Sequence, residues 1–228
     1  MDSALLSLTV ASIAFAGGHF ALSHPLRAPL VKRLGPNGFQ GLYSVLVIAT
    51  MVWMYFAFKA VAPAAPPFWP GFDDISWAIG SALSLVSLVM IVGAASPKNP
   101  AMALPGADDA ARAEPQGLFT VTRHPMMWGF ALWSVSHIIA APTARTLVVA
   151  SAVLVLALVG ARLQDRKKRA LMGEAWTQWE ARTSFWPKWQ RITAAGWKVW
   201  LIATALWLGI SWLHQPLGGW DAGLWRWI

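Results

Sequence analysis

The chain of 228 residues contains no cysteine, and this absence excludes several kinds of site. Without a thiol there is no disulfide framework, no thiolate zinc or iron–sulfur centre, no cysteine nucleophile and no covalent c-type haem. Charged residues are also scarce, at 12% of the chain, about half the share usual in soluble globular proteins. No aspartate or glutamate falls deep in a long apolar stretch. Paired-carboxylate catalysis, proton relays through buried acids and hard-cation sites therefore lack the side chains they need.

Hydrophobic residues, in contrast, make up 57% of the chain, and the mean hydropathy is +0.49. Six apolar stretches approach or reach the length of about 20 residues that a helix needs to cross a bilayer. We therefore expect an all-α fold, a polytopic membrane helix bundle in which residues 1–228 form a single domain. The six expected transmembrane helices are residues 5–23, 39–61, 75–95, 126–141, 146–161 and 199–214.

The basic residues are distributed unevenly along the chain. Fifteen of the 18 follow the first, third and fifth expected spans, and the other three are Lys59, Arg145 and Arg226. Because cytoplasmic segments of membrane proteins are enriched in lysine and arginine, both termini are predicted outside the cytoplasm of a bacterial inner membrane. The net charge of +8 then needs no nucleic acid as a partner. The start Met1–Asp2–Ser3 lacks the positive charge of a signal peptide, so we expect the first helix to be retained.

Tryptophan is concentrated near the C-terminus, where eleven of the 16 follow residue 175. Several of these alternate with lysine and arginine between residues 165 and 198, as in an amphipathic helix that lies in the headgroup layer. We therefore expect a cytoplasmic interfacial helix in this segment and an aromatic belt on the opposite side of the membrane. The tryptophans of the interfacial helix are Trp176, Trp179, Trp186 and Trp189, and those of the belt are Trp220, Trp225 and Trp227.

With thiolates and buried carboxylates absent, the five histidines are the side chains that remain as strong metal ligands. Two facing imidazoles in an apolar bundle are a familiar way to hold the iron of a b-type haem. His19 and His137 lie inside expected spans, whereas His24, His124 and His214 lie at span ends, where a capping or interfacial role is common. With a rise of about 1.5 Å per residue, His137 lies roughly 15–20 Å from the cytoplasmic end of its helix, and His19 only about 7 Å. For these two histidines to bind one iron, the helix that carries His137 must tilt or bend. His124 therefore remains an alternative partner for His19 or His24.

Two stretches of the chain carry a family resemblance. The first is Gly18–His19–Phe20 followed by Ser23–His24–Pro25–Leu26–Arg27, and the second is Thr122–Arg123–His124–Pro125–Met126 followed by Trp128–Gly129 and Ser136–His137. Together they resemble the signatures of the NnrU family of membrane proteins and of its relative, zeta-carotene isomerase. The similarity extends over nearly the whole chain.

The resemblance implies a non-covalent haem b with His137 as one iron ligand and His19, or the nearby His24, as the other. Arg123 and His124 are then expected to orient a haem propionate or to act as catalytic groups. The implied activity is a redox-dependent cis–trans isomerisation of a carotenoid-like polyene, or a role in nitric oxide and denitrification metabolism. The implied partners are a lipophilic small molecule or a redox partner linked to nitric oxide, together with membrane lipids.

Two alternatives compete with this interpretation. Arg123–His124–Pro125 and the later Trp186–Pro187 are also similar to membrane methyltransferases of the isoprenylcysteine and phospholipid type. Those enzymes have a Glu-Glu pair where this chain has Gln164–Asp165, and this departure weakens the comparison. The second alternative is a non-catalytic assembly factor for a reductase.

Overall fold

The computed structural model describes residues 2–62, 67–95, 99–102 and 106–228, and these segments contain helices and no strand. The all-α prediction is therefore confirmed for the described residues. The α-helices are α1 Ser3–Ser23, α2 Arg27–Ala60, α3 Asp74–Ala94, α4 Ala107–Arg112, α5 Pro125–Ala140, α6 Ala144–Met172, α7 Glu174–Arg182 and α8 Trp197–Gly218. Two 3₁₀ helices lie between α-helices, η1 Gly117–Thr120 and η2 Trp189–Ala195, and a third, η3 Gly223–Arg226, follows α8.

Four helices, α1, α2, α3 and α6, are long and apolar enough to cross a membrane. A fifth span is reached if η2 and α8, which meet at an angle of 92°, are counted together. Helix α5 has 16 residues, which is about 24 Å of helix against a hydrocarbon core of about 30 Å. The fold therefore fits a helical membrane protein with four or five spans, and the six expected spans are not confirmed.

Helix α2 is longer than the span expected at 39–61 because it includes a break. Gly35 has a φ of 70° and a ψ of 169°, and Pro36 follows it. A positive φ suits glycine, and proline supplies no backbone N–H, so the helical hydrogen bonding is interrupted at this point. The apolar part of α2 that follows the break corresponds to the expected span.

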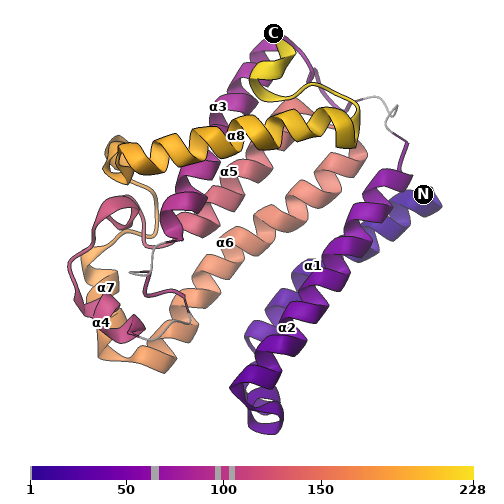
Figure 1. The fold of residues 1–228 in the computed structure, drawn as a ribbon. Helices are drawn as coiled ribbons and strands as arrows, with labels where there is room; N and C mark the ends of the chain where they lie inside the picture. The colour runs from indigo at the N-terminus through magenta and orange to yellow at the C-terminus, as the bar shows by residue number, and fades with distance from the viewer. Residues whose placement is uncertain (1, 63–66, 96–98, 103–105) are drawn as a thin grey trace.

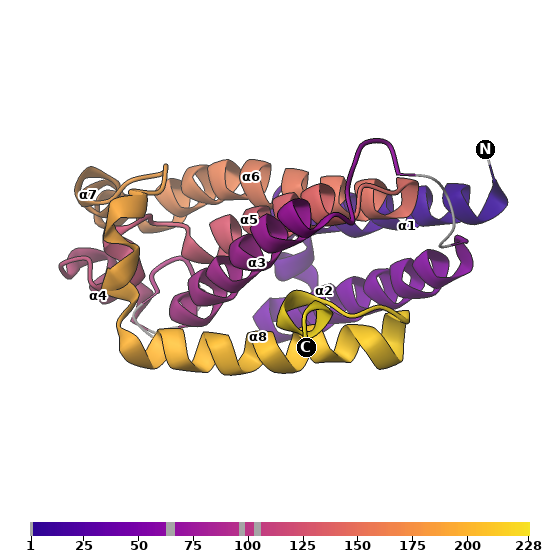
Figure 2. The ribbon, with the colours of Figure 1, turned by 90° about the horizontal axis from the view of Figure 1, so that it is seen from above.

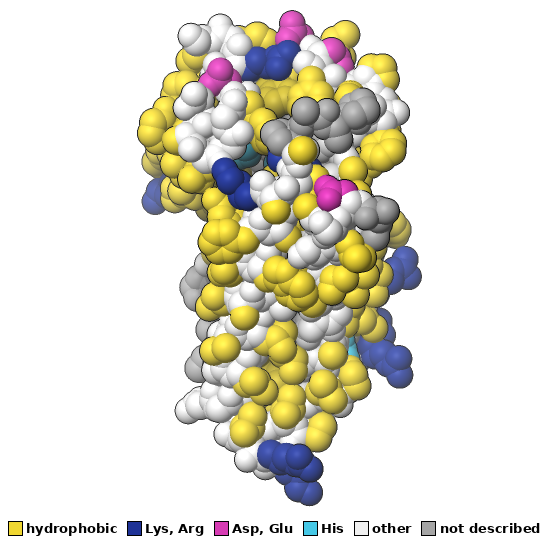
Figure 3. Space-filling model, turned by 90° about the vertical axis from the view of Figure 1, so that its right-hand side faces the viewer, with side chains coloured by type: hydrophobic (Ala, Val, Ile, Leu, Met, Phe, Trp, Pro, Cys, Tyr) yellow, Lys and Arg dark blue, Asp and Glu magenta, His cyan; other side chains and the backbone are white. Residues whose placement is uncertain are grey.

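The helices form antiparallel neighbours (Figures 1 and 2). Helices α1 and α2 make a hairpin that packs on α6 through α1, and α5 and α6 make the tight second hairpin that their short junction predicts. Helix α3 packs along α5, and α8 passes over α3. Large apolar side chains on the outer surface include Ile13, Val45 and Phe56, which are 66%, 67% and 64% exposed. Figure 3 shows hydrophobic side chains spread along the side of the molecule that it draws, with lysine and arginine at the lower end and also near the upper end and at the right edge.

Small residues let α3 and α5 approach closely. The Ser87 hydroxyl donates a hydrogen bond to the Gly129 carbonyl at 2.7 Å. A Cβ at Gly129 would lie 2.6 Å from Cγ1 of Ile91, and one at Gly80 would lie 2.9 Å from Cβ of Ala140. Close approach of backbones at small residues is a common source of helix association in membranes, where the hydrophobic effect is weak.

The expected interfacial helix at 165–198 is wrong in its main part. Helix α6 continues through Asp165 to Met172, and the short α7 follows it. Trp176 and Trp179 are fully buried on α7, where they pack with Ala111 of α4 and Phe119 of η1. Alternation of tryptophan and basic residues suits a membrane surface, but here the preceding segment with α4 and η1 covers the rings. Trp186 is 61% exposed, so its ring is accessible, as a residue on a membrane surface must be.

Replacing Gly129 with alanine is expected to destabilise the protein by about 1–3 kcal/mol, because the added methyl group overpacks the α3–α5 contact. Gly160 is the matched control, since a Cβ there meets nothing within 4 Å. Thermal unfolding of the detergent-purified variants, followed by circular dichroism, measures the difference. Equal stability of the Gly129→Ala and Gly160→Ala variants would show that the helices do not depend on this close approach.

Candidate functional site

A cavity of about 770 Å³ lies among α2, α3, α5, α6 and α8. This volume is typical of small-molecule sites, which range from about 300 to 1,000 Å³. Apolar and aromatic side chains form most of the wall. Four nitrogen-bearing side chains interrupt it: Lys59, His137, Arg145 and His214.

His137 of α5 and His214 of α8 face the cavity together. Their ring centroids are 6.4 Å apart, and their planes differ by 30°. Nδ1 of His137 lies 2.8 Å from the Trp133 carbonyl, and Nδ1 of His214 lies 2.9 Å from the Ile210 carbonyl. Because a carbonyl only accepts, each Nδ1 must carry a proton and donate. Each Nε2 then keeps a lone pair, which is the orientation that histidine ligands of metals usually have.

The spacing of the two rings suits one metal ion between them. An imidazole–metal bond is about 2.0–2.1 Å long for zinc, so two imidazoles on opposite sides of one ion have centroids roughly 6 Å apart. No group of three His, Cys, Asp or Glu side chains that could hold a metal occurs in the described part of the chain. A haem iron needs only axial ligands from the protein, since the porphyrin supplies four nitrogens. The donor set and the cavity therefore fit haem b.

The sequence analysis expected His19 to lie next to His137, but the structure places the two residues apart. Nδ1 of His19 donates to the Phe15 carbonyl at 2.8 Å, and its ring meets the edge of Tyr43 at 5.6 Å. Both histidines lie near the C-terminal ends of their helices, and Figure 1 shows that these ends of α1 and α5 lie at opposite ends of the bundle. The antiparallel course of the chain is the reason, and the histidine whose ring lies near that of His137 is His214.

His24, the alternative ligand, caps α1 at the basic end of the bundle. Burial lowers the pKa of its imidazole, and the nearby charges of Lys167 and Arg166 lower it further. The surroundings therefore favour a neutral ring among cations.

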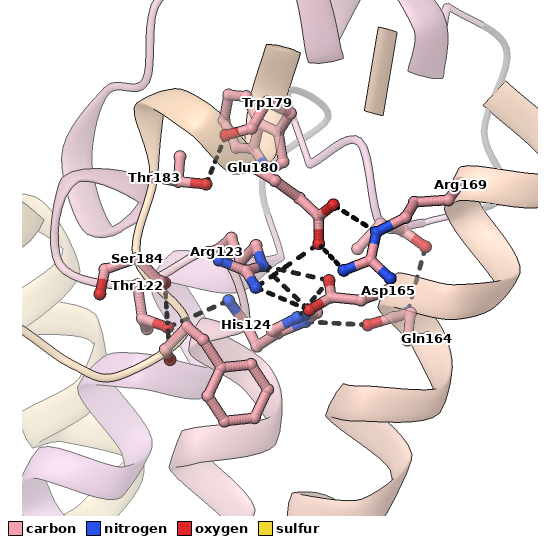
Figure 4. Close-up of polar contacts among 12 residues, drawn as sticks. Thr122, Arg123, His124, Gln164, Asp165, Arg169, Trp179, Glu180, Thr183 and Ser184 are labelled. Atoms are coloured by element: carbon pink, nitrogen blue, oxygen red, sulfur yellow. Dashed lines mark hydrogen bonds and ion pairs between the residues drawn. The ribbon is translucent and has the colours of Figure 1, made fainter. Parts of the chain in front are cut away.

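Arg123 and His124 meet in a buried polar network at the start of α5 (Figure 4). Arg123 donates from Nε and Nη2 to the Asp165 carboxylate, with distances of 2.8–3.1 Å. Nε2 of His124 lies 2.8 Å from Oδ1 of Asp165, and Nδ1 lies 3.2 Å from Oε1 of Gln164. The Gln164–Asp165 pair of α6 thus contacts the Arg123–His124 pair directly.

The same network extends to α7. Nη2 of Arg169 donates to Oε1 of Glu180 at 2.8 Å, and Arg123 lies 3.5 Å from the same carboxylate. The His124 side chain has no exposed surface, so it is enclosed by the protein. This geometry gives Arg123 and His124 a structural role that joins α5, α6 and α7. Their expected catalytic role stays a prediction, and the methyl-transfer interpretation gains no support from an enclosed, internally paired site.

Sequence reasoning identified His137 and missed three other residues of the cavity. His214 was interpreted as a helix-end residue, and Lys59 and Arg145 were counted only as exceptions to the charge distribution. The signal that could have singled out Arg145 is its place as a lone cation in the short junction between two expected spans, on the side that is otherwise poor in basic residues.

Comparison with known families gives one match. The family model described as NnrU protein matches residues 7–222, nearly the whole chain. No curated protein and no solved structure matches the chain.

Replacing Asp165 with asparagine is expected to destabilise the protein by about 3–5 kcal/mol, because Arg123 and His124 lose their buried counter-charge. The Glu114→Gln variant is the control, since the Glu114 side chain is 80% exposed in its pair with Arg182, and exposed pairs contribute about 0–1 kcal/mol. Thermal unfolding in detergent compares the two. If Asp165→Asn were as mild as the control, the network would not hold the helix ends together.

Proposed function

The chain belongs to the NnrU family, and from this premise we propose that it is an integral membrane protein that binds haem b. In this proposal His137 and His214 would hold the haem iron, and the cavity among α2, α3, α5, α6 and α8 would enclose the porphyrin. The observation that carries the proposal is the pair of imidazoles 6.4 Å apart on the cavity wall, each with Nδ1 bonded to its own helix.

The elements around the cavity hold the two ligands in place. The carbonyls of Trp133 and Ile210 orient the rings through the hydrogen bonds at Nδ1. Trp207 of α8 donates from Nε1 to the Ser84 hydroxyl of α3 at 2.8 Å, which fixes α8 across the opening. Aromatic walls also exclude water, and a dry apolar setting retains a non-covalent porphyrin.

Haem b held by two imidazoles supplies one-electron chemistry when it is bound. The apolar wall of the cavity favours a lipophilic partner, and we propose a redox-dependent cis–trans isomerisation of a polyene as the reaction. Nitric oxide, a small uncharged ligand, is the second partner that such a wall admits. By the positive-inside rule, the proposal places the basic end of the bundle in the cytoplasm of a bacterial inner membrane.

The pyridine haemochrome assay and the Soret spectrum of the detergent-purified protein test the haem assignment. We expect a b-type spectrum in the wild type, and loss of haem or a shifted Soret band in both His137→Ala and His214→Ala. His19→Ala is the matched control, because this histidine has the same Nδ1–carbonyl bond but lies outside the cavity. A wild type without haem after expression with excess haem would contradict the proposal. Loss of haem in His19→Ala with retention in His214→Ala would return the ligand role to the pair expected from the sequence.

A further inference from the structure

Arg145 is a buried cation on the wall of the same cavity. It is 6% exposed, and its guanidinium lies between the rings of Phe58 and Trp220, at 4.6 and 5.0 Å from their centroids. Nη1 donates to the Val61 carbonyl at 3.2 Å. Among the described residues no carboxylate forms an ion pair with it, whereas Arg123 pairs with Asp165 and Arg226 pairs with Asp74.

An unpaired guanidinium at this place is costly for two reasons. Taking a charge out of water costs several kcal/mol unless a counter-charge and hydrogen bonds compensate it. A guanidinium has five N–H donors, and among the described residues its hydrogen bond is the one to the Val61 carbonyl. Arg145 also lies in the first turn of α6, where the helix dipole favours an anion and opposes a cation. The described chain therefore provides no anion that neutralises the charge of Arg145.

Lys59 places a second cation on the same cavity wall. It lies in the last turn of α2, and its Nζ donates to the Leu217 carbonyl of α8 at 2.8 Å. Arginine binds carboxylates in a bidentate manner, and lysine adds a point charge. The two cations come from the end of α2 and the start of α6, so they border one region of the cavity.

We infer that Arg145, assisted by Lys59, binds the carboxylate of an anionic ligand that occupies the cavity. The inference rests on the proposed function, which makes the carboxylates the two propionates of haem b. Arg145 and Lys59, at the start of α6 and the end of α2, would then hold the propionates, and His137 and His214 would hold the iron. Arg145 is a positioning residue in this arrangement.

Spectral titration of the haem-free wild-type protein with haem b and with its dimethyl ester tests the inference. The ester keeps the iron and the ring but has no carboxylate. Because hydrogen bonds to charged groups contribute the equivalent of about tenfold or more in affinity, we expect the wild type to prefer haem b by at least that factor. Arg145→Gln is expected to bind both forms alike, and Arg145→Lys to retain part of the preference. Arg162→Gln, an exposed change on the same helix, is expected to keep the full preference.

The outcomes separate the two proposals. Equal binding of haem b and its ester by the wild type overturns the inference while the haem assignment stands, and this result needs no variant to fold. Retention of the full preference in Arg145→Gln also overturns it. A wild type that takes up neither porphyrin overturns the proposed function together with the inference that depends on it.

Discussion

The buried carboxylate of Asp165 is the interaction on which the arrangement of the helices depends. It accepts hydrogen bonds from Arg123 and His124, the two residues that immediately precede α5. Because a buried ion pair tolerates little displacement, this contact fixes where α5 begins along α6. His137 follows His124 by 13 residues in the same helix, about 20 Å further along. A polar network at one end of the bundle thus determines the position of an imidazole in the cavity near the other end.

Charged side chains are neutralised differently at the two ends of the bundle. At the Asp165 end, the chain itself supplies carboxylates to Arg123 and Arg169, so the network is complete within the protein. At the cavity end, Arg145 is buried, and among the described residues two aromatic faces and one carbonyl compensate its charge. Aromatic faces attract a cation but do not replace a carboxylate. This difference is the reason for assigning the first site a structural role and for proposing that a ligand completes the second.

Hydropathy alone predicted the parts of the fold that depend on length and polarity. Helices α1, α3 and α6 and the apolar part of α2 are where bilayer-length runs placed them. The predictions that failed concern contacts between distant segments. The alternation of tryptophan and basic residues around Trp176 and Trp179 fits a membrane surface as well as a packed core. The packing of Phe119 against these rings decides for the core. His137 was identified from its depth and its motif. His214 was not, because its approach to His137 depends on how α8 crosses the bundle.

Of the three basic residues that depart from the positive-inside pattern, two line the cavity and the third contacts a residue of its wall. Lys59 and Arg145 line it, and the guanidinium of Arg226 lies 4.9 Å from the ring centroid of Trp77, another residue of its wall. Orientation in the membrane requires few basic residues on that side, so those present need a separate cause. Arg226 forms an ion pair with the Asp74 carboxylate, and Lys59 donates a hydrogen bond to the Leu217 carbonyl. Arg145 has no carboxylate partner among the described residues, and this is why the proposed ligand is placed beside it.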